Sequence, residues 1–211
     1  MTHRVLIAAE LKNLLEPAQL ADLDITWLAA DQPTPRGDWV AIVPLLSRWV
    51  GGTQLKNLPN LRIVANCAVG YNNVDLVAAE MRKVLVTNTP GVLTEATADL
   101  TWALILATAR RLLEGVELVR SGQWTGWHPE QLLGLELRGR ILGLLGAAGL
   151  DVYTDEPAIH PRLLAAPRTV LLPHIGSATE ETRRKMAAIA IANVQAVLNG
   201  KPPLTPVYKS V

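Results

Sequence analysis

One stretch decides how this chain folds: LRGRILGLLG at residues 137–146, followed directly by AAGLDVY at residues 147–153. The apolar run at 141–145 predicts a buried strand that ends at Gly146. In a dinucleotide-binding unit, such a strand leads into a glycine-rich loop and a helix whose N-terminus holds a pyrophosphate. Here a second strand-like run, 149–153, begins at once. We interpret the junction as the place where such a unit has been removed and its ends joined.

The composition is that of a globular protein with little electrostatic bias. The 211 residues suffice for one large domain, or for one domain and a remnant, and 49% of them are hydrophobic against 18% charged. A net charge of +1 gives no case for a nucleic-acid partner. The single Cys67 excludes an internal disulfide, so we expect a reducing, cytoplasmic location. We also expect no metal site and no membrane span, because the histidines lack ligand spacing and the apolar runs are short.

The first ninety residues alternate short apolar runs with helical stretches. Strands are predicted at 4–9, 24–28, 39–44, 61–66 and 84–88, and helices at 11–23, 52–57 and 74–82. Continuous apolar strands that alternate with helices favour a parallel sheet with helices on both faces. The pattern therefore predicts an α/β, flavodoxin-like doubly wound fold with five parallel strands, whose ligands lie at the carboxyl ends of the strands.

Two long helices follow. The longest helical pattern covers 94–120, and a last helix covers 180–198, where Asn199-Gly200 ends it. We expect both helices to pack against the five-stranded sheet.

Five motifs along the chain resemble one family. They are NCAVGYNNVD at 66–75, VTNTPGVLT at 86–94, ATADL at 96–100, GLDVYTDEP at 149–157 and LPHIGSAT at 172–179. Their order and content resemble the D-isomer-specific 2-hydroxyacid dehydrogenases, nearest the glyoxylate/hydroxypyruvate reductase branch. The resemblance covers nearly the whole chain.

The same resemblance shows what the sequence lacks. Members of that family carry a complete NAD(P)-binding domain between the strand at Ile141 and the strand at Leu150, so the deficit is roughly 100 residues, about one ordinary domain. The family's catalytic arginine lies in the missing part and has no match here. The resemblance therefore implies a substrate-binding domain, 1–120 with 176–211, and a remnant of a truncated Rossmann domain, 121–175. We expect this chain alone to bind no cofactor and to be catalytically inactive.

The resemblance implies roles for three residues in the second half of the chain. His174 matches the general acid/base that protonates the developing alkoxide, and Glu156 matches the carboxylate that orients it and raises its pKa. Taken alone, each would be read as an ordinary loop residue. Asp151 matches the position that holds the nicotinamide amide, and we regard that cofactor-binding role as vestigial.

The resemblance also places a substrate pocket in the first half. Val69-Gly70 matches the turn whose backbone amides bind the substrate carboxylate, and Leu46-Ser47 matches the second wall. Ordinary strand-end turn chemistry is the alternative for both pairs. We interpret Arg48, just beyond, as a surface residue and not as a replacement for the missing arginine.

The remnant should lack the helices that cover its strands in relatives, so apolar strand faces would be exposed. We expect it to repack on the core, or two chains to shield each other through it, giving a monomer or a dimer. In either case Glu156 and His174 should lose their catalytic spacing. Trp124 and Trp127 match an arm toward a second subunit, or are tryptophans exposed by the deletion.

Three hypotheses for the function remain. The first is an inactive, isolated substrate-binding domain that binds a small 2-oxo or 2-hydroxy acid at most weakly. The second is an NAD(P)H-dependent reductase of glyoxylate or hydroxypyruvate that is completed by a partner chain. The third is a small binding protein for 2-oxo acids.

Overall fold

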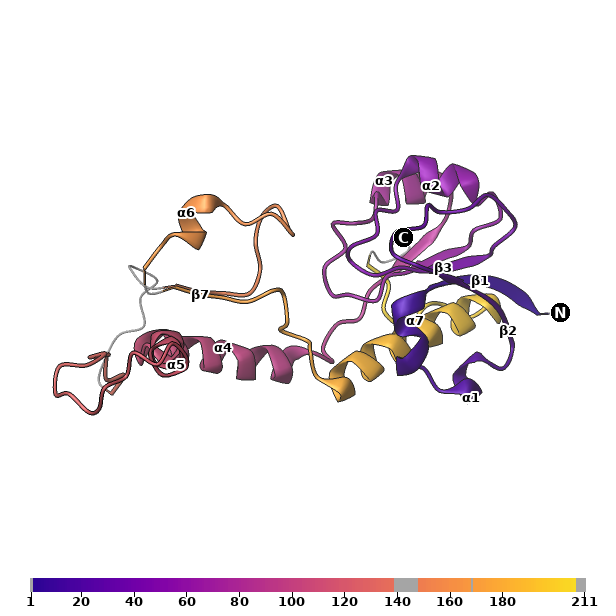
Figure 1. The fold of residues 1–211 in the computed structure, drawn as a ribbon. Helices are drawn as coiled ribbons and strands as arrows, with labels where there is room; N and C mark the ends of the chain where they lie inside the picture. Colours follow the sequence, from indigo (N-terminus) through magenta and orange to yellow (C-terminus); the bar gives the residue numbers. More distant parts are fainter. Residues whose placement is uncertain (1, 139–147, 168, 208–211) are drawn as a thin grey trace. The chain divides into compact units, whose positions relative to one another are not determined.

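The computed structural model describes residues 2–138, 148–167 and 169–207 (Figure 1). The chain forms two compact units, each described here by itself. Unit 1 comprises Met1–Leu93 with Thr179–Val211, and unit 2 comprises Thr94–Ala178. The strand that the sequence predicts at 141–145 lies outside the described residues.

Unit 1 contains a five-stranded parallel sheet, which confirms the predicted fold class. Its strands are β1 (His3–Ala8), β2 (Leu23–Leu28), β3 (Ala41–Val43), β4 (Ile63–Ala65) and β5 (Leu85–Thr87). They lie in the order β2-β1-β3-β4-β5, and every neighbouring pair is parallel. This is the strand order of flavodoxin-like sheets, in which ligands bind outside the carboxyl ends of the strands.

Alternate residues of these strands enter two separate cores, one on each face of the sheet. In β1, Val5 and Ile7 belong to the core that contains α7 (Glu180–Leu198), whereas Leu6 belongs to the core beneath α2 and α3. The helices α2 (Gly52–Asn57) and α3 (Leu76–Met81) cover that opposite face (Figure 1). Burial on both faces explains why the strands read as continuous apolar runs.

The helices of unit 1 match the sequence in part. The last helix occupies the predicted residues, and the Thr179 side chain caps it by accepting a hydrogen bond from the Thr182 amide. The single helix predicted at 11–23 is instead a 3₁₀ helix, Ala9–Leu14, followed by the short α1 (Pro17–Leu20). Pro17 accounts for the break, because its ring cannot continue a helix from the preceding turn and it occupies the first turn of α1.

Unit 2 contains a two-stranded parallel sheet and three helices among its described residues. The elements are α4 (Thr94–Ala109), α5 (Leu112–Arg120), β6 (Ala148–Leu150), α6 (Pro161–Leu164) and β7 (Thr169–Leu171). The prediction of one continuous helix over 94–120 was wrong. Arg111 has a left-handed backbone, with φ of 55°, and this residue separates α4 from α5.

Helix α4 packs against β6 and β7, whereas the sequence analysis expected it on the five-stranded sheet. The contact is close at Gly149 of β6, where an added Cβ would lie 2.9 Å from the Cβ of Leu104. Because of this packing, the boundary between the units falls after Leu93 and after Ala178. Residues 94–120, which the sequence predicts to belong with residues 1–93, lie in unit 2.

In the described part of the chain, no helix is long and apolar enough to cross a membrane. No group of three or more His, Cys, Asp or Glu residues among residues 2–138, 148–167 and 169–207 is placed to hold a metal ion.

Candidate functional site

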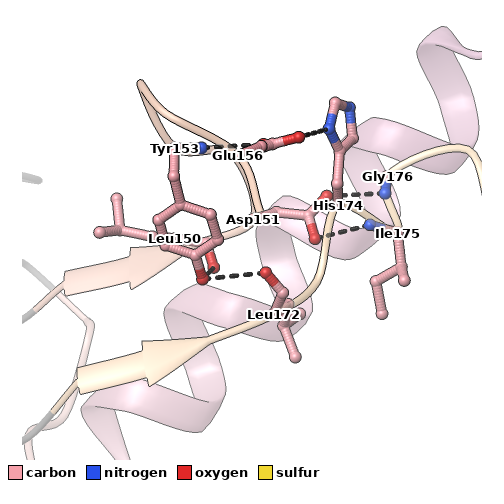
Figure 2. A network of polar contacts seen from close by, with 8 residues as sticks. All are labelled: Leu150, Asp151, Tyr153, Glu156, Leu172, His174, Ile175 and Gly176. Atoms are coloured by element: carbon pink, nitrogen blue, oxygen red, sulfur yellow. Dashed lines mark hydrogen bonds and ion pairs between the residues drawn. The ribbon is translucent and has the colours of Figure 1, made fainter. Parts of the chain in front are cut away.

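His174 and Glu156 form a hydrogen-bonded pair in unit 2. His174 follows β7 and Glu156 lies in the turn after β6, and the imidazole Nδ1 is 2.7 Å from the carboxylate Oε2 (Figure 2). The other carboxylate oxygen, Oε1, accepts a hydrogen bond of 2.9 Å from the Tyr153 amide. These two interactions, that with His174 first, lower the pKa of Glu156 below its ordinary value, so the carboxylate stays ionised.

The expectation that this pair loses its catalytic spacing was wrong. Strands β6 and β7 pair directly with each other, so the turns after them leave the sheet at the same end. The Tyr153 hydroxyl joins the two turns, because it lies 2.9 Å from the carbonyl oxygen of Leu172 and 3.3 Å from that of Leu150 (Figure 2). The local geometry of the pair therefore depends on this two-stranded sheet.

Asp151 supports the same turn from the other side. Its Oδ1 accepts from the Ile175 amide and its Oδ2 from the Gly176 amide, both at 2.7 Å (Figure 2). His174, the residue before these amides, has a left-handed backbone with φ of 55°. The carboxylate thus binds the backbone of the turn that carries the imidazole.

This arrangement suits proton exchange. When Glu156 accepts the Nδ1 proton, a neutral imidazole keeps its free electron pair on Nε2, and a charged one carries a proton there. The His174 side chain is 41% exposed, so a small molecule can approach it. Either protonation state leaves Nε2 able to take up or release one proton.

The Val69-Gly70 turn follows β4 in unit 1, and its carbonyl oxygens are all held by the protein. The carbonyl of Ala68 accepts from the Thr89 amide at 2.9 Å. The carbonyls of Val69 and Gly70 accept from the side-chain amides of Asn88 and Asn66, at 2.9 and 2.8 Å.

Fixing these carbonyls also fixes the N–H groups of the turn. In a trans peptide, the carbonyl of one residue and the N–H of the next point in opposite directions. The N–H groups of Val69, Gly70 and Tyr71 therefore point away from Thr89, Asn88 and Asn66. Among the described residues, none of these three N–H groups has a protein acceptor, and both Val69 and Gly70 are exposed. Neighbouring unpaired backbone N–H groups are a ready site for an anion.

A buried pair of amide side chains supports this turn, and the sequence analysis assigned it no role. Asn66 and Asn73, which are 0% and 7% exposed, hydrogen-bond to each other at 3.0 and 3.2 Å. The Asn73 amide also lies within 3.1 Å of the carbonyls of Leu45 and Arg48. The pair thus joins the turn after β4 to the turn after β3. Two asparagines close to the end of a buried strand were the available signal, because a buried amide needs partners.

Leu46 and Ser47 lie in the exposed turn after β3. Leu46 lies beside the Val69-Gly70 turn, since a Cβ added at Gly70 would lie 3.8 Å from the Cδ1 of Leu46. The Arg48 guanidinium donates to the backbone carbonyls of Ala29 and Gln32, so it anchors the loop after β2. The structure thus groups Leu46, Ser47, Val69 and Gly70 in unit 1, and Asp151, Glu156 and His174 in unit 2.

Trp124 and Trp127 lie in unit 2 and are 53% and 83% exposed. They line a groove together with apolar side chains of α5 and of the segment after it, Leu118, Val119 and Leu132.

Comparison with known proteins matches residues 39–208 to the catalytic domain of the D-isomer specific 2-hydroxyacid dehydrogenases. A glyoxylate reductase of Aeropyrum pernix is 54% identical over 120 residues, which are 55% of this chain and 36% of that protein. A glyoxylate reductase of Thermococcus gammatolerans is 30% identical over 278 residues, covering 81% of this chain and 83% of that protein.

Among solved structures, an NADPH-dependent glyoxylate/hydroxypyruvate reductase of Sinorhizobium meliloti, in complex with NADP and malonate, has the same fold. Its TM-score is 0.80 at 23% identity, with all of both chains covered. The Thermococcus alignment spans 278 residues but contains only 81% of this 211-residue chain. The relative therefore has roughly 100 additional residues, the size of an ordinary domain. The chain belongs to the family of D-isomer specific 2-hydroxyacid dehydrogenases.

Proposed function

We propose that this chain is the substrate-binding part of a D-2-hydroxyacid dehydrogenase of the glyoxylate/hydroxypyruvate reductase type, and that it is inactive as a single chain. It binds a small 2-oxo or 2-hydroxy acid weakly. The observation that carries the proposal is the His174–Glu156 pair at 2.7 Å in a sequence that continues from Gly146 to Gly149 without a phosphate-binding loop. The names of the relatives, which are glyoxylate reductases, support the substrate class.

The substrate's carboxylate binds to the N–H groups of Val69 and Gly70. Their carbonyls are held by Asn88 and by Asn66, so the N–H groups are oriented before the ligand arrives. Preorganised donors cost little free energy to order, and a carboxylate accepts charge-assisted hydrogen bonds from them. Leu46 presents an apolar side chain beside Gly70.

Within unit 2, His174 is the proposed general acid/base, which exchanges a proton through Nε2. Glu156 accepts the Nδ1 proton and stabilises the positive charge of the imidazolium. The Tyr153 amide keeps the carboxylate of Glu156 in place. These residues supply a proton at Nε2 and nothing more.

The residues present do not fit the dinucleotide that family members such as the Sinorhizobium reductase bind. A pyrophosphate needs a glycine-rich loop at the start of a helix, and the sequence between Ile141 and Leu150 contains neither. Asp151 matches the position that holds the nicotinamide amide in the family. Here both of its carboxylate oxygens accept backbone hydrogen bonds. We therefore derive no hydride-transfer step for this chain.

A second candidate is a reductase whose cofactor site comes from a partner chain. The His174–Glu156 pair is compatible with it, because the pair would supply the acid/base once a partner chain supplied the cofactor site. Apolar side chains exposed on unit 2 offer a surface that a second chain could cover, and they include Trp102, Leu106, Leu112, Val116, Trp124 and Trp127. We propose a dimer through unit 2, in the cytoplasm, as the state in which either form occurs.

Titration followed by NMR tests the proposal. Glycolate, glyoxylate and hydroxypyruvate should shift the amide signals of residues 69–71 with dissociation constants of roughly a millimolar. Glycolamide, which lacks the carboxylate, should leave these signals unchanged. Neither NADH nor NADPH should show saturable fluorescence changes, and turnover should be absent. Micromolar NADPH binding or measurable reduction of glyoxylate by the purified chain would instead establish the second candidate, and the absence of any carboxylate response at 69–71 would exclude the proposed binding site.

A further inference from the structure

Asp151 uses its whole carboxylate on the backbone of one turn. The two oxygens accept from the consecutive amides of Ile175 and Gly176, each at 2.7 Å (Figure 2). These distances are short for N–H···O hydrogen bonds and are typical of charge-assisted ones. Asp151 immediately follows β6, and the turn follows β7, so the interaction joins the ends of the two paired strands.

The conformation of His174 explains what this interaction holds. A non-glycine residue with φ of 55° costs free energy, because its Cβ approaches its own backbone. Such a residue persists only when its surroundings fix it. Here the left-handed residue His174 is followed directly by the two amides that Asp151 binds. The carboxylate therefore stabilises the backbone conformation in which both amides point toward it.

The turn is also held from helix α4. The carbonyl oxygen of Gly176 lies 3.4 Å from the Thr97 hydroxyl. A Cβ added at Gly176 would lie 3.3 Å from Asp151 Oδ2 and 3.5 Å from Thr97 Oγ1. The backbone after His174 is thus enclosed between the carboxylate and the helix, with little room to move.

We propose that Asp151 is a positioning residue for His174, which keeps the imidazole directed at Glu156 by binding the backbone amides of Ile175 and Gly176. The inference rests on the proposed function in one respect, that His174 is the group that exchanges a proton. It replaces the vestigial cofactor role with a structural one that this chain can perform without a dinucleotide.

The first measurement needs no variant. In the unmodified protein, the amide protons of Ile175 and Gly176 should exchange with solvent at least roughly tenfold more slowly than unprotected amides. The neutral His174 ring should carry its proton on Nδ1, because Glu156 accepts it, and the ¹⁵N shifts of the ring report this tautomer directly. Free amide exchange at both positions would overturn the proposal.

The second measurement uses Asp151→Asn, which keeps the shape but can accept from only one amide and turns a donor toward the other. We expect exchange at Ile175 and Gly176 to rise roughly tenfold or more. We expect the neutral His174 ring to lose its Nδ1–H preference. The matched control is Asp155→Asn in the same turn, because the described residues offer its carboxylate no hydrogen bond, and it should change neither readout.

Each outcome has a defined meaning. An unchanged His174 tautomer in folded Asp151→Asn would overturn the positioning role, and amide signals elsewhere in unit 2 show whether the variant is folded. Failure of glycolate to shift residues 69–71 would overturn the proposed function while leaving the exchange and tautomer results in place.

Discussion

The Nδ1 atom of His174 lies 2.7 Å from the Oε2 atom of Glu156, although 18 positions separate the two residues in the sequence. Two local features bring them together: the direct pairing of β6 with β7, and the Tyr153 hydroxyl that lies against the carbonyls of Leu150 and Leu172. None of these contacts involves the residues that relatives carry in addition. The geometry of the pair is therefore a property of a short segment of unit 2.

The pair should make the stability of the chain depend on acid pH. His174 and then Tyr153 lower the pKa of Glu156 below its ordinary value of 4.5. A carboxyl group whose pKa is lowered in the folded protein stabilises it at pH values above the ordinary pKa. This contribution is lost as the pH falls through the lowered pKa. Glu156→Gln should thus be less stable than the unmodified protein at about pH 6, by less than about 1 kcal/mol because the pair is exposed to solvent. The difference should shrink as the pH falls from about 6 to about 3.

Urea unfolding at both pH values measures this difference. Glu130→Gln, which changes an exposed carboxylate of the same unit, is the control and should match the unmodified protein at both pH values. A stability difference for Glu156→Gln that persists unchanged at low pH would contradict the ion-pair interpretation.

Binding of a carboxylate at the Val69-Gly70 turn should depend on Asn88, whose side chain donates to the Val69 carbonyl. Asn88→Ala removes that hydrogen bond, so the peptide that presents the Gly70 N–H can rotate. We expect glycolate to bind roughly three- to tenfold more weakly, as for the loss of one hydrogen bond. Asn72→Ala, an exposed change in the same turn, should bind glycolate like the unmodified protein. Equal affinity in both variants would show that Asn88 does not orient the turn.

Sequence alone predicted the sheet of unit 1 well, because the inner strands β1, β3 and β4 are buried on both faces and therefore contain continuous apolar runs. It also predicted the last helix, since Thr179 begins it and Asn199-Gly200 ends it. The single helix predicted at 94–120 was wrong because helix-forming and apolar residues occur on both sides of Arg111. An apolar pattern does not reveal that Arg111 has a left-handed backbone. The packing of α4 on β6 and β7 was not predicted, because the apolar pattern of a helix does not tell which sheet it covers.

The candidate site, too, could be predicted from the sequence only in part. The motifs predict Val69-Gly70, His174 and Glu156 as site residues, and their roles stay predictions. The expected loss of the spacing between Glu156 and His174 followed from counting exposed apolar faces. The direct pairing of β6 with β7, which needs no other strand, keeps the two residues close together. The roles of Asn66, Asn73 and Asn88 depend on which carbonyl each amide reaches, and sequence does not give that information.

Removal of the buried amide of Asn73 should destabilise unit 1. Asn73→Ala deletes the interactions with the carbonyls of Leu45 and Arg48 and leaves the buried Oδ1 of Asn66 without its donor. A buried polar group without a partner costs about 1–3 kcal/mol, so we expect a loss of about 2 kcal/mol in the free energy of unfolding. Asn60→Ala, at an exposed contact with Asp38, should cost less than about 0.5 kcal/mol. Denaturant unfolding distinguishes the two, and equal losses would mean that the amide pair is not structural.

Cys67 should be inert until unit 1 opens. Burial raises the pKa of its thiol to about 12, and the positive charge of Arg183 offsets this only in part. The side chain is 5% exposed, so both access and the reactive thiolate are scarce at about pH 8. We expect labelling by a disulfide reagent to be at least roughly a hundredfold slower in the folded protein than in urea. Asn73→Ala should accelerate it, because a less stable unit 1 opens more often, whereas Asp151→Asn should leave it unchanged. Rapid labelling of the unmodified protein under native conditions would contradict the burial of Cys67 at the end of β4.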